Sequence, residues 1–168
     1  EQFLTEFTDA VDAGLTETQL AAILAAHPVF TNGILGDQNT TSSQVALLMD
    51  HYGLVADGVT DSAASQAEDF FTNSIDWDVG FDTIIIQAGV FLLSDSVPAE
   101  FTETANLFKN KITVAGVYSA SNSSTDLATL QSPLAGLSGE TVMTPEDATT
   151  FLQNGGIIPN PNSATLDE

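Results

Sequence analysis

The chain has 168 residues, of which 43% are hydrophobic, so it is long and apolar enough to bury a core. It carries 23 Asp and Glu against 2 Lys and no Arg, a net charge of -21 at pH 7, which excludes nucleic acid and anionic membrane surfaces as partners because both need a basic footprint. Without cysteine it has neither disulfides nor thiolate metal sites. The longest apolar run, residues 84–93, is well short of the roughly 20 residues that span a bilayer, so we expect no membrane insertion.

The first 75 residues place apolar side chains at helical spacing between polar turns. Thr16 and Gln19 form the residue pair of a capping box, ahead of an apolar run that ends at Pro28. The segment Thr31–Gln44 is rich in Gly, Thr and Ser and indicates a loop. The predicted helices of this part lie at residues 3–13, 17–27, 43–52 and, capped by Asp61 or Ser62, through residue 75.

Asp76-Trp77-Asp78 ends that helix, and Asp78 is expected to cap a fifth one over residues 79–94. The run Ile84-Ile85-Ile86 in its middle has strand propensity. More than twelve residues without a turn signal nevertheless favour a buried helix over a buried strand.

Residues 97–119 predict the longest helix, roughly 33 Å at 1.5 Å per residue. Its apolar residues form two stripes about 120° apart, a pattern typical of a central helix. It also holds both basic side chains, Lys109 and Lys111. Two residues on a helix are about 200° apart, so the lysines do not form one basic patch. We expect Lys111 to lay its stem along the core and to meet a carboxylate from another helix.

Leucines at residues 127–134 indicate a short helix, and Thr144-Pro145 begins the last one with a cap and a proline at the first helical position. Residues 157–168, rich in Pro, Asn and Ser, are typical of a tail or linker toward another domain. The predicted fold class is therefore all-α, a compact bundle of about six to eight short helices around a central helix near residues 98–119. The predicted domain covers residues 1–156.

Catalytic motifs are missing from the sequence. His27 and His51, the two histidines, lie at helix ends and at no metal-binding spacing. Nucleophile-elbow, P-loop and dinucleotide-binding patterns do not occur. The sequence thus predicts no catalytic residue and no required cofactor.

Carboxylates crowd two turns around Gly58 and Gly80, where their oxygens would suit a hard cation such as Ca²⁺. Neither turn matches an EF-hand loop, because the glutamate at the twelfth position and the correctly placed glycine are missing. Helix capping by Asp61 and Asp78 explains most of both clusters. The candidate Ca²⁺ ligands are Asp57 and Asp61 in the first turn, and Asp76, Asp78 and Asp82 in the second.

Four segments resemble core-helix motifs of a known small all-helical domain: L-L-M-D-H-Y-G-L at 47–54, Q-A-E-D-F-F at 66–71, V-F-L-L-S-D at 90–95 and A-N-L-F-K-N-K-I-T-V-A-G-V-Y at 105–118. That domain of unknown function, related to phycobilisome linkers, recurs in bacterial type I secreted repeats-in-toxin adhesins and in the N-terminal regions of S-layer proteins. The resemblance covers about residues 40–120. The usual arginine and Asp-Pro-Asp-like loop are replaced here by Asp57-Gly58-Val59-Thr60-Asp61.

The resemblance, the acidity and the missing cysteine together predict a non-catalytic module of a secreted or cell-surface bacterial protein, S-layer or adhesin-like and exported by type I secretion. It would act outside the cell, in a calcium-rich setting, in surface attachment or assembly. The expected partners are cell-surface polysaccharide and further copies of the chain. The alternative is a carboxylate-dependent hydrolase of an extracellular polysaccharide or polymer, which needs two carboxylates in one groove.

Overall fold

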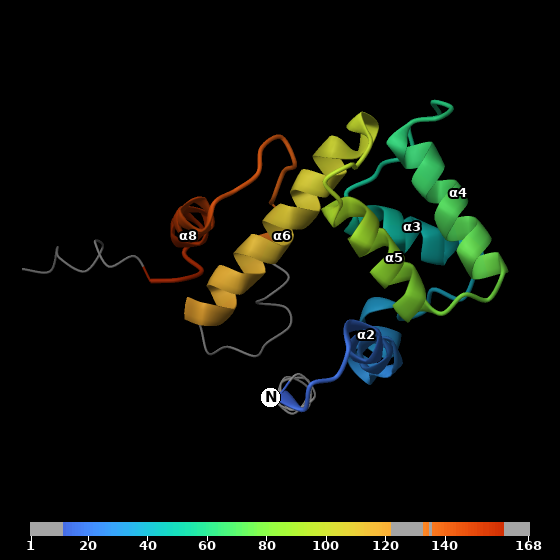
Figure 1. Ribbon diagram of the computed structural model, residues 1–168, viewed down its shortest axis with the longest axis horizontal. Coiled ribbons are helices and arrows are strands. Elements are labelled where there is room, and N and C mark those ends of the chain that lie inside the picture. The colour runs from blue at the N-terminus through green and yellow to red at the C-terminus, as the bar shows by residue number, and fades with distance from the viewer. Residues whose placement is uncertain (1–11, 122–132, 135, 160–168) are drawn as a thin grey trace, which may run out of the picture. The chain divides into compact units, whose positions relative to one another are not determined.

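The computed structural model describes residues 12–121, 133–134 and 136–159, and every regular element in these ranges is helical (Figure 1). The elements are α2 (Glu17–Ala26), the π-helical η1 (Val29–Ile34), α3 (Thr41–His51), α4 (Ala63–Asp76), α5 (Phe81–Leu93), the 3-10 turn η2 (Ala99–Phe101), α6 (Thr102–Ser121) and α8 (Pro145–Asn154). The predicted all-α class is confirmed, and the long helix expected near residues 98–119 is present as η2 running into α6. Most of the helix predicted at 3–13 and most of that at 127–134 lie outside the described residues.

The chain divides into two compact units, with the boundary inside α6. The N-terminal unit is Gln2–Thr104, and the C-terminal unit contains Ala105–Glu168. In the N-terminal unit, α2 packs on α5 and α3 packs on α4.

Three helices supply the core of the N-terminal unit, and their buried residues recur at steps of three and four, so that each helix turns one face inward. The buried side chains of these helices are Val45, Leu48, Met49 and Tyr52 from α3 and its end, Ala64, Ala67 and Phe71 from α4, and Ile84, Ala88 and Leu92 from α5, and Phe101 of η2 is also buried. Burial of each larger side chain contributes roughly 1.5–3 kcal/mol. Ile84 is completely buried within a helix, which confirms the helical interpretation of the isoleucine run.

The predicted caps of α2 and α8 are confirmed. The Thr16 hydroxyl oxygen accepts a hydrogen bond from the Gln19 backbone N–H, and Gln19 Oε1 accepts one from the Thr16 backbone N–H. Thr144 pairs in the same way with Asp147, and Pro145 is the first residue of α8. The hydrogen bonds from the backbone N–H and hydroxyl of Thr144 lower the pKa of the Asp147 carboxyl.

The expected loop over Thr31–Gln44 is wrong at both ends. Residues 29–34 form the π-helical η1, and α3 begins at Thr41, two residues earlier than predicted. The earlier start has a local cause, because the Thr40 hydroxyl accepts from the backbone N–H of Ser43 and the Ser43 hydroxyl accepts from that of Thr40. This is a capping box made with serine in place of the usual glutamate or glutamine.

The predicted role of Asp78 as the cap of α5 is wrong. The N-cap is Gly80, which has no capping side chain, and Asp78 instead adopts a left-handed conformation with φ of 57° at the end of α4. Its N–H donates to the Ile75 carbonyl, while the Val79 N–H donates to the Ser74 carbonyl. These two bonds form a Schellman motif, which ends α4.

The same motif ends α3 and α8, with Gly53 and Gly156 in the left-handed position. Asp78 therefore occupies a position that the other two helices give to glycine. The sequence marks the glycines as helix ends, but an aspartate before an apolar run also has the pattern of a helix start.

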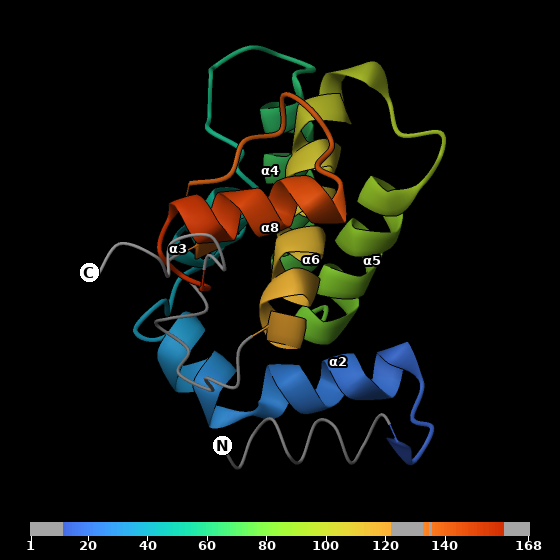
Figure 2. The ribbon, with the colours of Figure 1, turned by 90° about the vertical axis from the view of Figure 1, so that its left-hand side faces the viewer.

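In the C-terminal unit, α8 crosses α6 (Figure 2). A cluster of buried apolar residues in this unit consists of Val114, Tyr118, Ala148, Leu152 and Ile158. Ile158 belongs to the segment predicted as a tail, so the packed part of the chain extends past residue 156. The rest of that segment, residues 160–168, lies outside the described residues.

Candidate functional site

The first acidic turn is organised by Asp57. Its Oδ1 accepts hydrogen bonds from the Val59 N–H and the Ser62 hydroxyl, both at 2.9 Å. These bonds stabilise the carboxylate and lower the pKa of Asp57. Ser62 is also the N-cap of α4, one of the two alternatives that the sequence left open. Asp61, the other alternative, has φ of 61° and accepts through its backbone carbonyl from Gln66 Nε2.

The three carboxylates of the second acidic turn lie at different helix ends and have different partners. Asp76, the last residue of α4, accepts from the Thr41 hydroxyl at 2.9 Å. Asp78 forms the end of α4, and Asp82 lies in the first turn of α5 beside the helix N-terminus. The Asp82 carboxylate also lies over Gly80, where any added side chain would collide with it. Each carboxylate is thus tied to a helix end.

The five predicted Ca²⁺ ligands are all described, and the structure does not bring them into one cluster. In the described part of the chain, no group of three or more His, Asp or Glu side chains is arranged to hold a metal ion. The capping that the sequence offered as the alternative explanation is wrong for both named residues, because Ser62 caps α4 and Gly80 is the N-cap of α5. Calcium binding stays a prediction.

A groove of about 630 Å³ lies between α3 and α4 in the N-terminal unit. Val45, Met49 and Leu54 contribute apolar surface to it. Its polar lining consists of three carboxylates and three hydroxyls: Asp50, Glu68, Asp76, Thr41, Ser42 and Thr72. The three carboxylate residues are exposed to solvent. Such a surface can accept and donate hydrogen bonds to a polyhydroxylated ligand.

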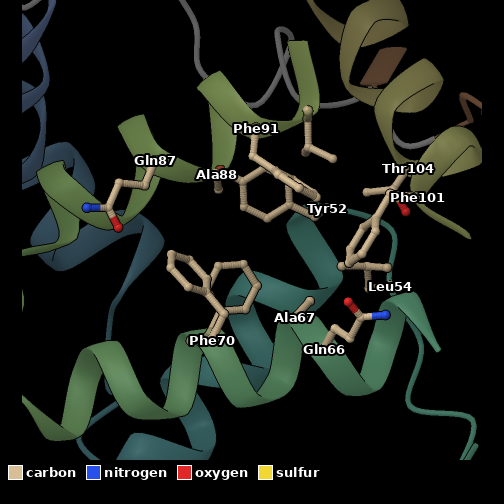
Figure 3. Close-up of a pocket in the computed structure, with 12 residues that line it drawn as sticks. Tyr52, Leu54, Gln66, Ala67, Phe70, Gln87, Ala88, Phe91, Phe101 and Thr104 are labelled. Atoms are coloured by element: carbon tan, nitrogen blue, oxygen red, sulfur yellow. The ribbon is translucent and has the colours of Figure 1, made fainter. Parts of the chain in front are cut away.

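A second, smaller pocket of about 260 Å³ lies between α4, α5, η2, the start of α6 and the residues just after α3 (Figure 3). Aromatic rings dominate it, and Phe70, Phe91 and Phe101 point toward its interior in the close-up. Phe91 meets Phe101 edge to face, with ring centroids 5.0 Å apart, and Phe71 stacks on Tyr52 at 5.8 Å. These paired rings give the pocket rigid apolar walls.

The polar groups of this aromatic pocket are few. Gln66 and Gln87 are exposed at its edge, and Thr104 is buried. Gln66 Nε2 donates to the Asp61 carbonyl at 2.8 Å and to Glu100 Oε1 at 3.3 Å, which holds its amide beside the opening. Burial raises the pKa of Tyr52 to about 12, so its hydroxyl stays protonated at neutral pH.

Carboxylates and aromatic rings are therefore found in different hollows. The groove between α3 and α4 has carboxylates and no aromatic side chain in its lining, whereas the aromatic pocket has rings and no Asp, Glu, His or Lys. Sequence reasoning named Asp76 of the groove but missed Asp50, Glu68 and the aromatic pocket. The available signal was the adjacent pair Phe70 and Phe71. Two neighbouring residues on a helix point in different directions, so two adjacent phenylalanines make the apolar face of α4 wider than one stripe.

The histidines lie at helix ends, as expected. His27 is the C-cap of α2, and its Nδ1 accepts from the Val29 N–H at 3.1 Å, which ties the end of α2 to the start of η1. His51 is the last residue of α3 and is exposed.

Comparisons with protein-family models, curated proteins and solved structures gave no match to the chain, so the family resemblance stays a prediction. Among the described residues, the structure contains no helix that is both long and apolar enough to cross a membrane.

Proposed function

We propose that the chain is a non-catalytic module of a secreted or cell-surface bacterial protein, S-layer or adhesin-like, that contributes to surface attachment or assembly. The groove between α3 and α4 is the observation that carries this proposal. It offers hydroxyls and carboxylates beside apolar surface, a combination suited to the hydroxyl groups and the carbon face of a sugar. A polysaccharide of neutral or amino sugars suits the acidic lining, because an anionic polymer would be repelled.

The separation of carboxylates from aromatic rings favours attachment over hydrolysis. A retaining or inverting glycosidase uses one carboxylic acid that stays protonated, which commonly requires an apolar environment. Asp50, Glu68 and Asp76 are exposed instead. The groove also lacks an aromatic side chain in its lining. The groove thus meets the requirement of a hydrolase for several carboxylates, but it lacks the apolar surroundings that would keep one of them protonated.

Charge supports the extracellular, calcium-rich setting of the proposal. A net charge of -21 on 168 residues creates self-repulsion that ions outside the cell would screen. Calcium would act here mainly as a screening ion, or as a bridge between copies. Thermal unfolding with millimolar calcium or chelator, at low and high salt, separates these contributions. An unchanged melting temperature in all four conditions would contradict the calcium part of the proposal.

Attachment is tested by co-sedimentation of the chain with bacterial cell envelopes stripped of protein. Glu68→Gln changes a groove carboxylate, whereas Asp69→Asn removes the same charge from the next residue of α4, which does not line the groove. We expect Glu68→Gln to lower binding and Asp69→Asn to retain it. Equal binding by both variants, or no binding by the native chain, would contradict the attachment role. Release of new reducing ends from the envelope polysaccharide would favour the hydrolase.

A further inference from the structure

We propose that the aromatic pocket of the N-terminal unit binds a small uncharged molecule with two fused aromatic rings. This site is separate from the groove proposed for surface attachment, and the inference does not depend on that role. The pocket is formed within one unit, by side chains of α4, α5, η2, the first turn of α6 and the segment that follows α3.

The lining selects an uncharged ligand. Five aromatic residues face the pocket, and no Asp, Glu, His or Lys is among the residues that line it. An ion moved into such an environment loses hydration without gaining an oppositely charged partner. An uncharged aromatic ring has no such hydration to lose, and it gains edge-to-face or stacked contacts with the phenylalanine side chains of the pocket.

The volume selects the size of the ligand. An apolar protein cavity of about 150 Å³ holds a single benzene ring. The aromatic pocket measures about 260 Å³, which leaves room for a second fused ring. A molecule of the naphthalene or indole class matches this space.

The edge of the pocket offers both access and one polar contact. Phe70 and Phe91 line it and are 36% and 41% exposed, so the space is reachable from solvent. The Gln66 side-chain amide on α4 donates its hydrogen bonds to the Asp61 carbonyl and to Glu100. Gln87 lies across the pocket on α5, as the close-up shows (Figure 3). The Gln87 amide oxygen can accept a hydrogen bond from a ring N–H, which favours indole over naphthalene.

The test is a titration of the full chain with naphthalene and with indole, followed by calorimetry and by NMR shifts. We expect dissociation constants on the order of 100 μM and shifts that centre on Phe70, Phe91 and Phe101. Ala88→Leu, which fills the pocket from α5, is expected to abolish binding. Ala67→Leu fills it from α4 and serves if the first variant does not fold. Ala63→Leu, on α4 but outside the lining, is the matched control and keeps binding.

A second variant examines the polar contact. Gln87→Leu is expected to weaken indole by about fivefold and to leave naphthalene unchanged. Three outcomes would overturn the proposal: no shifts with either compound, shifts that map away from the aromatic pocket, or unchanged binding in a folded filling variant. Tetramethylammonium serves as a cation probe, and binding of it as tight as that of naphthalene would overturn the choice of an uncharged ligand.

Discussion

Asn110 Oδ1 accepts a 2.7 Å hydrogen bond from the backbone N–H of Met143, so a side chain of α6 holds the segment that leads into α8. The same amide donates through Nδ2 to the carbonyls of Ser138 and Thr141, each at 2.8 Å. Asn110 is only 1% exposed. Both the amide nitrogen and the amide oxygen of Asn110 therefore have hydrogen-bond partners inside the C-terminal unit. These partners are backbone groups of a loop, which have no partner in a helix or a sheet.

Removal of this amide should be costly. Asn110→Ala leaves two carbonyls and one N–H without their partner, and we expect a loss of about 3 kcal/mol in the free energy of unfolding. Asn106→Ala, which removes one 3.1 Å bond to the Gly139 carbonyl from a half-buried position, should cost only about 1 kcal/mol. Urea unfolding compares the two variants, and equal losses would contradict the role of Asn110 as the main tie of this segment.

The Tyr118 hydroxyl presents the opposite case. Tyr118 is 1% exposed, and in the part of the chain that the structure describes its hydroxyl oxygen has no hydrogen-bond partner. A buried polar group without a partner costs free energy, so Tyr118→Phe should leave stability unchanged or raise it by about 1 kcal/mol. Thermal and urea unfolding measure this change. A loss of more than about 1 kcal/mol would show that the hydroxyl has a partner.

The left-handed backbone conformation of Asp78 at the end of α4 is expected to be strained. Its φ of 57° is one that glycine adopts freely, and Gly53 and Gly156 hold the same position in α3 and α8. Asp78→Gly should therefore stabilise the protein by about 0.5–1 kcal/mol. Asp69→Gly, in the interior of α4, should destabilise it by about 0.5 kcal/mol. If both substitutions changed the free energy of unfolding in the same direction, the backbone of Asp78 would not be strained.

Asp57 should give the acidic turn a defined pH dependence. Hydrogen bonds from the Val59 N–H and the Ser62 hydroxyl lower the pKa of Asp57 in the folded state. The unfolded chain therefore takes up the proton first as pH falls, and the stabilisation present at neutral pH is lost below the ordinary Asp pKa of about 3.9.

An NMR titration of the Asp57 carboxyl carbon measures this effect. Ser62→Ala should raise the pKa of Asp57 toward its ordinary value, whereas Ser62→Thr keeps a hydroxyl at this position and should preserve the lowered pKa. An unchanged titration in Ser62→Ala would assign the shift to the Val59 N–H alone.

The helices were predictable where local chemistry determines them. Thr16 with Gln19 and Thr144 with Pro145 mark helix starts through contacts within four residues, and the run Ile84–Ile86 is resolved by length. Asp78 was misjudged because an aspartate suits a helix start and also tolerates the left-handed end of a helix.

The candidate sites were less predictable, because they depend on which helices pack together. Asp50 and Glu68 lie on different helices and share a groove only because α3 packs on α4. The same holds for Phe70 and Phe91 in the aromatic pocket. Periodicity within one helix indicates which face is apolar, but it does not identify the helix opposite.

The position of the two lysines makes the local opening of α6 measurable by proteolysis. With no arginine in the chain, Lys109 and Lys111 are the only places where trypsin can cut, and both lie inside this helix. A protease needs an extended backbone at the bond that it cleaves, so cleavage requires α6 to open locally. The rate of tryptic digestion under native conditions therefore reports the opening of a single helix, without any label or engineered site.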